Sequence, residues 1–122
     1  MTLYHLTWES NLPSIRKNGI VPNFNPNGWG PKSKRFSVGR TFLCERHRIK
    51  YWRHSLQYRM RDDPGGHGRI VRLHVLVDGL DIRQDTRQYK RKIDGEWKTT
   101  EIFWGDFWTP EIIPPSRIKF QI

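Results

Sequence analysis

The sequence predicts a single compact domain of the α+β class, with two helices near the N-terminal half and a strand-rich C-terminal half. The 122 residues suit one hydrophobic core, because two domains would each bury too little apolar surface. Hydrophobic residues form 35% of the chain and aromatic residues 13%, which is enough to build that core. Apolar spacing is helical between residues 45 and 61, and between residues 70 and 77 an apolar residue stands at every second position from Val71 to Val77.

The first elements are a strand and a short helix. Residues 3–8 are rich in aromatic and β-favouring side chains, which is typical of a strand. Leu12 and Ile15 give the following segment the apolar side of a helix. Asn18 and Gly19 are residues that end helices, so we expect the helix to stop there.

A long loop separates these elements from a second strand and a longer helix. Residues 22–40 are rich in proline and glycine, and loops of this length are usually functional or mobile. Residues 40–44 predict a short strand, and residues 45–61 a basic helix. The Asp63-Pro64-Gly65-Gly66 run ends that helix.

The C-terminal half predicts further strands. Residues 70–77 give the clearest strand of the chain, because Val71, Leu73, Val75 and Val77 alternate on one face. Residues 81–95 are polar and predict a loop, with a helical turn around residues 83–89. Residues 97–109 predict one or two strands interrupted at Gly105-Asp106, and residues 117–122 an amphipathic final strand.

Positive charge is concentrated in the first part of the chain. The formal net charge is +10, and residues 1–69 hold 13 Lys/Arg against 4 Asp/Glu, a balance of +9. Such a field attracts phosphates. The charge therefore favours nucleic acid, DNA or RNA, or another polyanion as partner; a solvated basic surface, an acidic protein and a membrane surface remain alternatives.

Cysteine usage and hydropathy indicate a cytoplasmic protein. Cys44 is the only cysteine, so an intrachain disulfide and thiol-based zinc sites are excluded. His47 and His54 lack the further acid or cysteine that a metal site needs, and we expect no metal. No leader is visible and no apolar stretch approaches the ~20 residues of a membrane span. We expect a monomer without membrane contact.

Several short motifs occur in a recognisable order. The strand Leu3-Tyr4-His5-Leu6-Thr7 is followed by the turn Asn18-Gly19-Ile20-Val21-Pro22. Thr41-Phe42-Leu43 precedes Tyr51-Trp52 by about ten residues, and an acidic residue comes shortly before Ile113-Pro114-Pro115. In this order, the segments resemble proteins with the ADP-ribosyltransferase fold, and most closely their small bacterial and phage branches, which include DNA- and RNA-modifying toxins. The resemblance covers both ends and about half of the chain.

This resemblance implies a split β-sheet core and an NAD site. It implies that His5 hydrogen-bonds the ribose beside nicotinamide, that the backbone near Leu6 pairs with the nicotinamide amide, and that Thr7 belongs to the same cofactor site. Phe42 and Tyr51 would pack the nicotinamide ring. Arg40, with Lys34 and Arg35, is placed to meet the pyrophosphate.

The resemblance also implies a catalytic carboxylate that stabilises the positive charge formed as nicotinamide leaves. Asp106 is the best-placed acid, although the family usually has Glu, and Glu101 and Glu111 remain alternatives. Phe42 also departs from the family, because it lacks the usual Tyr or Ser hydroxyl. Catalysis is therefore expected to depend on His5 and Asp106.

Two functional hypotheses follow. The first is an NAD-dependent ADP-ribosyltransferase, of toxin type, that modifies nucleic acid or a nucleic-acid-associated protein and has a possible neutralising protein partner. The second is a catalytically degenerate basic module that blocks or recruits a nucleic-acid or protein partner. RNA 2′-phosphotransferase chemistry, which also uses NAD, is a third and weaker hypothesis because its Arg/His set is not recognisable here.

Overall fold

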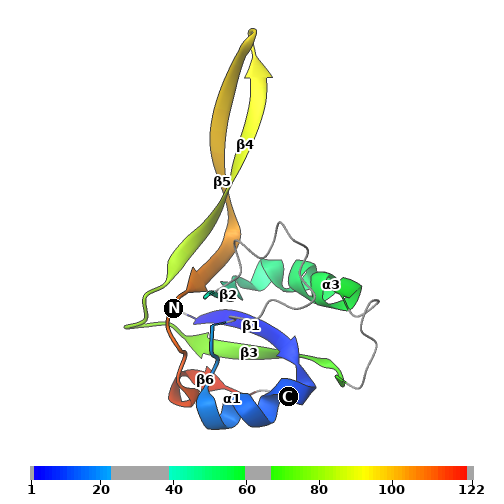
Figure 1. Cartoon of the computed structure of the whole chain (residues 1–122), viewed down its shortest axis with the longest axis vertical. Helices are drawn as coiled ribbons and strands as arrows, with labels where there is room; N and C mark the ends of the chain where they lie inside the picture. The colour runs from blue at the N-terminus through cyan, green and yellow to red at the C-terminus, as the bar shows by residue number, and fades with distance from the viewer. Residues whose placement is uncertain (1, 23–38, 60–66, 121–122) are drawn as a thin grey trace.

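A six-stranded antiparallel sheet forms the centre of the protein in the computed structural model, which describes residues 2–22, 39–59 and 67–120 (Figure 1). The strands are ordered β4-β5-β2-β1-β3-β6. In chain order the elements are β1 (Thr2–Trp8), η1 (Glu9–Asn11), α1 (Leu12–Asn18), β2 (Thr41–Cys44), η2 (Arg46–Arg48), α3 (Ile49–Arg59), β3 (Ile70–Leu76), β4 (Arg83–Ile93), β5 (Glu96–Thr109), η3 (Pro115–Arg117) and β6 (Ile118–Lys119). The described residues thus form a small α+β domain with two α-helices, as expected from the sequence.

The core lies on one face of the sheet and under α1. Val71, Leu73 and Val75 alternate along β3 and are almost fully buried, because strand side chains point to opposite faces in turn. Leu12 and Ile15 of α1 join the same buried cluster. Helix α3 packs through Trp52 against the ring of Phe42 on β2.

Strands β1 and β2 barely pair. β1 pairs with β3 along its whole length, from Thr2↔Leu76 to Trp8↔Ile70. It pairs with β2 only at Tyr4↔Cys44. The sheet is therefore weakly joined between β4-β5-β2 and β1-β3-β6, and backbone groups of β1 and β2 beyond that pair are left for other contacts.

The turn after α1 is joined to the segment before η3. Ile20 and Ile113 form an isolated β-bridge, with two backbone hydrogen bonds of 2.9 Å. This bridge brings together two of the motifs that carry the family resemblance. Gly19 makes the approach possible, because it has φ +77° and an added Cβ would lie 2.1 Å from the Ile113 carbonyl oxygen.

The change Gly19→Ala is expected to lower the free energy of unfolding by about 2 kcal/mol or more, because strain at positive φ and a backbone clash act together. Gly95→Ala is the matched control: φ is +81° there, but an added Cβ would meet nothing within 4 Å. Urea unfolding of both variants measures the difference. Equal losses at the two positions would contradict the clash at Gly19.

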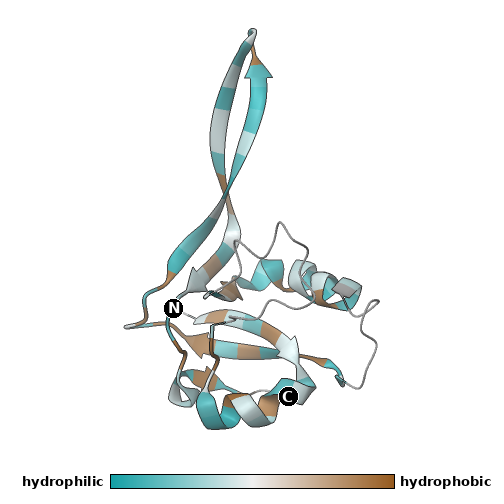
Figure 2. Cartoon of the chain, viewed as in Figure 1, coloured by the Kyte–Doolittle hydropathy of each residue, from teal (hydrophilic) through white to brown (hydrophobic). Residues whose placement is uncertain are grey.

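The polar segment before residue 96 is a strand, so the prediction of a loop with a helical turn around residues 83–89 is wrong. β4 pairs with β5 from Arg83↔Trp108 to Ile93↔Glu96. Most side chains on both faces of the hairpin are exposed, so neither face requires apolar residues. The alternation that normally marks a strand is therefore missing from this sequence (Figure 2). Asp94 and Gly95 form its two-residue turn, with φ of 51° and 81°.

β5 is one continuous strand through Gly105 and Asp106. Its pairing with β4 shifts there, from Gln84↔Phe107 to Thr86↔Phe103, so the expected interruption is a local irregularity. Residues 23–38 of the predicted loop, with Lys34 and Arg35, lie outside the described residues. Within the described ranges, no helix is long and apolar enough to cross a membrane.

Candidate functional site

A pocket of about 370 Å³ lies between β1 and β2 and is closed by residues of α1 and α3. Its size falls within the roughly 300–1,000 Å³ of small-molecule sites. Five of the predicted cofactor-binding residues line it, from both strands: His5, Leu6, Thr7, Arg40 and Phe42. His5 and Phe42, which are 37 positions apart in sequence, thus belong to one site.

His5 links the two strands across this pocket. Its Nδ1 lies 2.9 Å from the backbone oxygen of Phe42 and therefore donates to it, which fixes the tautomer. Burial lowers the pKa of His5, and the bond to Phe42 opposes this only in part. At neutral pH the ring is neutral, and its Nε2 is an acceptor with no partner in the described part of the chain.

Two threonines place hydroxyl groups at the pocket. Thr7 Oγ1 accepts a hydrogen bond of 2.9 Å from Asn11 Nδ2, which also lines the pocket. Thr41 is 4% exposed, and its Oγ1 has no hydrogen-bond partner among the described residues. Because an unpaired buried hydroxyl is costly, Thr41 marks a point where a ligand or water atom is needed.

The aromatic side of the pocket is formed by Phe42 and Trp52. Their rings are stacked at a centroid distance of 5.8 Å, and both line the pocket. Tyr51, the residue expected here from the sequence, is 51% exposed and does not line it. Its ring instead meets the guanidinium of Arg48 at 4.1 Å. Because one residue turns an α-helix by about 100°, Trp52 faces the pocket and Tyr51 faces away from it.

Arg40 is held at the edge of the pocket by an aromatic ring. Its guanidinium lies 4.1 Å from the ring centroid of Trp108, and Arg83 lies 4.9 Å from the same ring. Stacking leaves the edge of a guanidinium free to donate hydrogen bonds. Arg40 is therefore placed to meet an anionic part of a ligand in the pocket.

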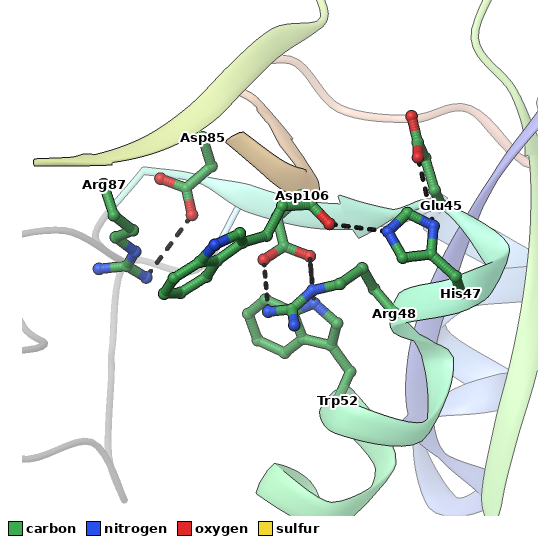
Figure 3. A network of polar contacts seen from close by, with 8 residues as sticks. Glu45, His47, Arg48, Trp52, Asp85, Arg87 and Asp106 are labelled. Carbon is green, nitrogen blue, oxygen red and sulfur yellow. Dashed lines mark hydrogen bonds and ion pairs between the residues drawn. The ribbon is translucent and has the colours of Figure 1, made fainter. Parts of the chain in front are cut away.

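Asp106 sits beside the pocket in a network of its own (Figure 3). Its carboxylate accepts bonds of 3.2 and 3.0 Å from Arg48 and one of 2.8 Å from Trp52 Nε1. The bond to Asp106 raises the pKa of Arg48. Asp106 does not line the pocket. Trp52 and Cys44, the residue that pairs with Asp106 between β2 and β5, both line it. The acid thus lies one side chain behind the pocket surface.

The alternative acids lie farther away. Glu101 accepts a hydrogen bond from Thr86 on the exposed hairpin, and Glu111 accepts one from the backbone of Asp81. None of the described Asp and Glu residues lines the pocket. Asp62 and Asp63 lie outside the described residues. Of the three acids named from the sequence, Asp106 is the one that accepts a hydrogen bond from a described pocket residue, Trp52.

Asp85 is a further carboxyl that sequence reasoning missed. Its side chain is 11% exposed, and Oδ2 lies 3.6 Å from Arg87 (Figure 3). Burial raises the pKa of Asp85, Asp106 adds to this, and Arg87 and Arg40 oppose it. No sequence signal marks it, because its surroundings depend on the shift in pairing between β4 and β5.

A second cavity, of about 850 Å³, is strongly basic. We call it the basic cavity; its Lys, Arg and His lining residues are Arg46, His47, Lys50, Arg53, His54 and Arg72, and none of the described Asp or Glu residues lines it. Arg72, Lys119 and Arg46 also help burial to lower the pKa of His74. Cations gathered without acids favour a polyanionic ligand such as a phosphate backbone.

Cys44 is expected to resist alkylation in the folded protein. It is 2% exposed, and burial, helped by Asp106, raises its pKa to about 12, so almost no thiolate exists at pH 8. Iodoacetamide labelling followed by mass spectrometry should show slow reaction in buffer and full reaction in urea. Rapid labelling in buffer would contradict this environment for Cys44.

No protein-family model, curated protein or solved structure matches this chain. Within the described ranges, no group of three or more His, Cys, Asp or Glu side chains is arranged to hold a metal ion. The function must therefore follow from the residues and geometry of the chain itself.

Proposed function

We propose that the protein is an NAD-dependent ADP-ribosyltransferase acting on nucleic acid or a nucleic-acid-associated protein. The observation that carries the proposal is His5, a neutral imidazole that bridges β1 and β2 at the pocket and keeps Nε2 as a free acceptor. A ribose hydroxyl is the kind of donor that such a nitrogen binds. The weak pairing of β1 with β2 agrees with the split sheet implied by the motif resemblance.

Other pocket residues fit the remaining parts of NAD. The stacked rings of Phe42 and Trp52 offer a flat surface for nicotinamide. The unpaired hydroxyl of Thr41 can bond a polar ligand atom. Arg40, stacked on Trp108, supplies positive charge for the pyrophosphate. In this assignment the chain orients the dinucleotide with neutral groups around the ribose and a cation at the pocket edge.

Transfer breaks the bond between ribose C1′ and the nicotinamide nitrogen. The electron pair of that bond leaves with nicotinamide, and positive charge develops on the ribose. A nucleophile of the target then bonds to C1′ and releases its proton to water. Asp106 is our candidate for stabilising the positive charge that develops on the ribose. Arg48 and Trp52 donate hydrogen bonds to its oxygens and hold the carboxylate one side chain behind the pocket surface, so in this proposal its charge acts on the ribose from behind the Trp52 ring.

The basic cavity supports a nucleic-acid target. Four Lys/Arg side chains line it without an acid, and Tyr51 contributes an exposed aromatic ring. Phosphate contacts from such residues provide affinity that is independent of sequence. The same arrangement would serve a protein that is itself bound to nucleic acid.

Incubation with NAD labelled in its adenosine part tests the transfer reaction. We expect release of nicotinamide together with label on DNA, on RNA or on a protein of a cell lysate that is lost after nuclease treatment. Boiled protein and lysate alone are the controls. Absence of both label transfer and nicotinamide release would overturn the proposed reaction.

The second candidate is a degenerate module that binds nucleic acid or a protein partner without catalysis. Two observations favour it: both oxygens of Asp106 accept hydrogen bonds from the protein, and none of the described acids lines the pocket. This function predicts salt-sensitive nucleic-acid binding without nicotinamide release. A rise in melting temperature on adding NAD would count against it.

A further inference from the structure

The hairpin of β4 and β5 projects from the domain as a two-stranded arm (Figure 1). We call residues 87–102 the arm; they pair from Arg87↔Ile102 to Ile93↔Glu96 around the Asp94-Gly95 turn. Figure 2 shows that this part of the hairpin is mostly hydrophilic. Two strands alone are marginally stable in water, so a long arm without a core points to a partner that it contacts.

The arm carries cations that have no ion-pair partner among the described residues. The arm contains five Lys/Arg against Asp94, Glu96 and Glu101, a balance of +2. Four of these cations have no ion-pair partner in the part of the chain that the structure describes: Lys90, Arg91, Lys92 and Lys98. Their charges are therefore available to an external anion.

Arg91 and Lys98 are placed directly opposite each other on the ladder. Like charges at such positions destabilise a hairpin, since the side chains are only about 5 Å apart at Cβ. A phosphate between them would turn this repulsion into attraction on both sides. The pair is thus better explained by a bound anion than by the stability of the arm itself.

Exposed aromatic rings accompany the cations on both faces. Because successive side chains alternate, Tyr89 shares a face with Arg91 and Lys98. Trp97 lies opposite Lys92 and shares the other face with it. Tyr89 is 56% exposed and Trp97 is 72% exposed. Each face of the arm therefore combines one aromatic ring with cations.

We propose that this arm enters the major groove of double-stranded DNA. That groove is about 12 Å wide and admits a two-stranded β-ribbon, whereas the major groove of duplex RNA is deep and narrow. The two walls of the groove are phosphate backbones, so a ribbon that enters the groove edge-on brings the cations of each face toward one wall. A ribbon lying on an acidic protein surface would need them on one face only.

The choice of nucleic acid as partner rests on the proposed function, and the inference names the target as duplex DNA. Binding by the arm needs neither NAD nor the transfer reaction. The two ideas can therefore fail separately. DNA binding by the protein alone reports on the arm, and the rise in melting temperature with NAD reports on the pocket.

The test is fluorescence anisotropy with a labelled 20-base-pair DNA duplex at several salt concentrations. In one variant, residues 88–101 are replaced by Asp-Gly, which closes the ladder at Arg87↔Ile102 with the same kind of turn. A second variant carries Arg91→Ala and Lys98→Ala. The control carries Arg16→Ala and Lys17→Ala on α1, which also removes two cations, far from the tip of the arm (Figure 1).

We expect the shortened variant to bind duplex DNA at least about tenfold more weakly than the wild type. The double variant should reduce the slope of log affinity against log salt by about 1.8, which is two phosphate contacts at ~0.9 each. The control should keep the wild-type slope, and NAD should raise the melting temperature of all four proteins equally. Wild-type affinity in the shortened variant, or tighter binding to single-stranded DNA or duplex RNA than to duplex DNA, would overturn the proposal.

Discussion

Replacing Asp106 with asparagine is expected to lower the free energy of unfolding by about 3 kcal/mol, because it leaves Arg48 charged and without its anion. The Arg48 side chain is 17% exposed and that of Asp106 is 7% exposed, so water replaces the lost partner poorly. Asparagine retains an acceptor for Trp52 Nε1, which limits the loss to the ion pair. Urea unfolding monitored by tryptophan fluorescence measures the change.

Two further variants identify the cause of that loss. Combining Asp106→Asn with Arg48→Met removes the unpaired charge, so the double variant should recover part of the lost stability. Glu101→Gln is the control at the exposed alternative acid and should change stability by less than about 0.5 kcal/mol. A double variant that is less stable than Asp106→Asn would contradict an unpaired Arg48 as the cause.

The change His5→Ala is expected to reduce nicotinamide release roughly 100-fold, since a misplaced ribose loses the geometry that the reaction needs. It removes both the bond from Nδ1 to the Phe42 carbonyl and the free acceptor at Nε2. Release is measured by chromatography at saturating target. His74→Ala is the matched control, because that histidine of β3 is influenced by Arg72 and Arg46 and does not line the pocket.

The pH dependence of the reaction should follow the neutral form of His5. Its pKa is lowered from the usual 6.5, so the wild-type ring remains neutral as pH falls from 8 to 6.5. Protonation below the lowered pKa converts Nε2 from an acceptor to a donor. Turnover through His5 should thus stay level above pH 6.5 and decline at lower pH. A decline that begins above pH 7 would contradict a buried, neutral His5.

The alternation and spacing of apolar residues predicted the strands and helices that bury one face. Val71, Leu73 and Val75 marked β3 because only one face of that strand meets the core. β4 was missed because most of its side chains are exposed on both faces, and polar residues or Tyr89 fill every position before Ile93. The Asp94-Gly95 pair was the available signal, since this dipeptide favours a two-residue hairpin turn.

The sequence predicted several residues of the candidate site and missed one of its aromatic residues. The sequence named His5, Leu6, Thr7, Arg40 and Phe42, and the fold brings these residues to one pocket. The sequence did not predict that Trp52, and not Tyr51, lines the pocket. Helical spacing does not determine how α3 is rotated about its axis against the sheet.

The surroundings of the acids also depend on contacts that are distant in sequence. Asp106 meets Arg48 only after β2 and β5 have paired, and these two residues are 58 positions apart. Asp85 is enclosed only because the register of β4 and β5 shifts beside it. Neither arrangement follows from residue spacing along the chain.

Isothermal titration calorimetry with NAD, comparing the wild type with His5→Ala, tests the central claim that the pocket between β1 and β2 binds NAD. We predict saturable binding near one NAD per chain, and at least about tenfold weaker binding by His5→Ala, the cost of one buried hydrogen bond. Circular dichroism of both proteins verifies that the variant is folded. Absence of binding to the wild type, or equal affinity in the folded variant, would contradict the assignment of the pocket.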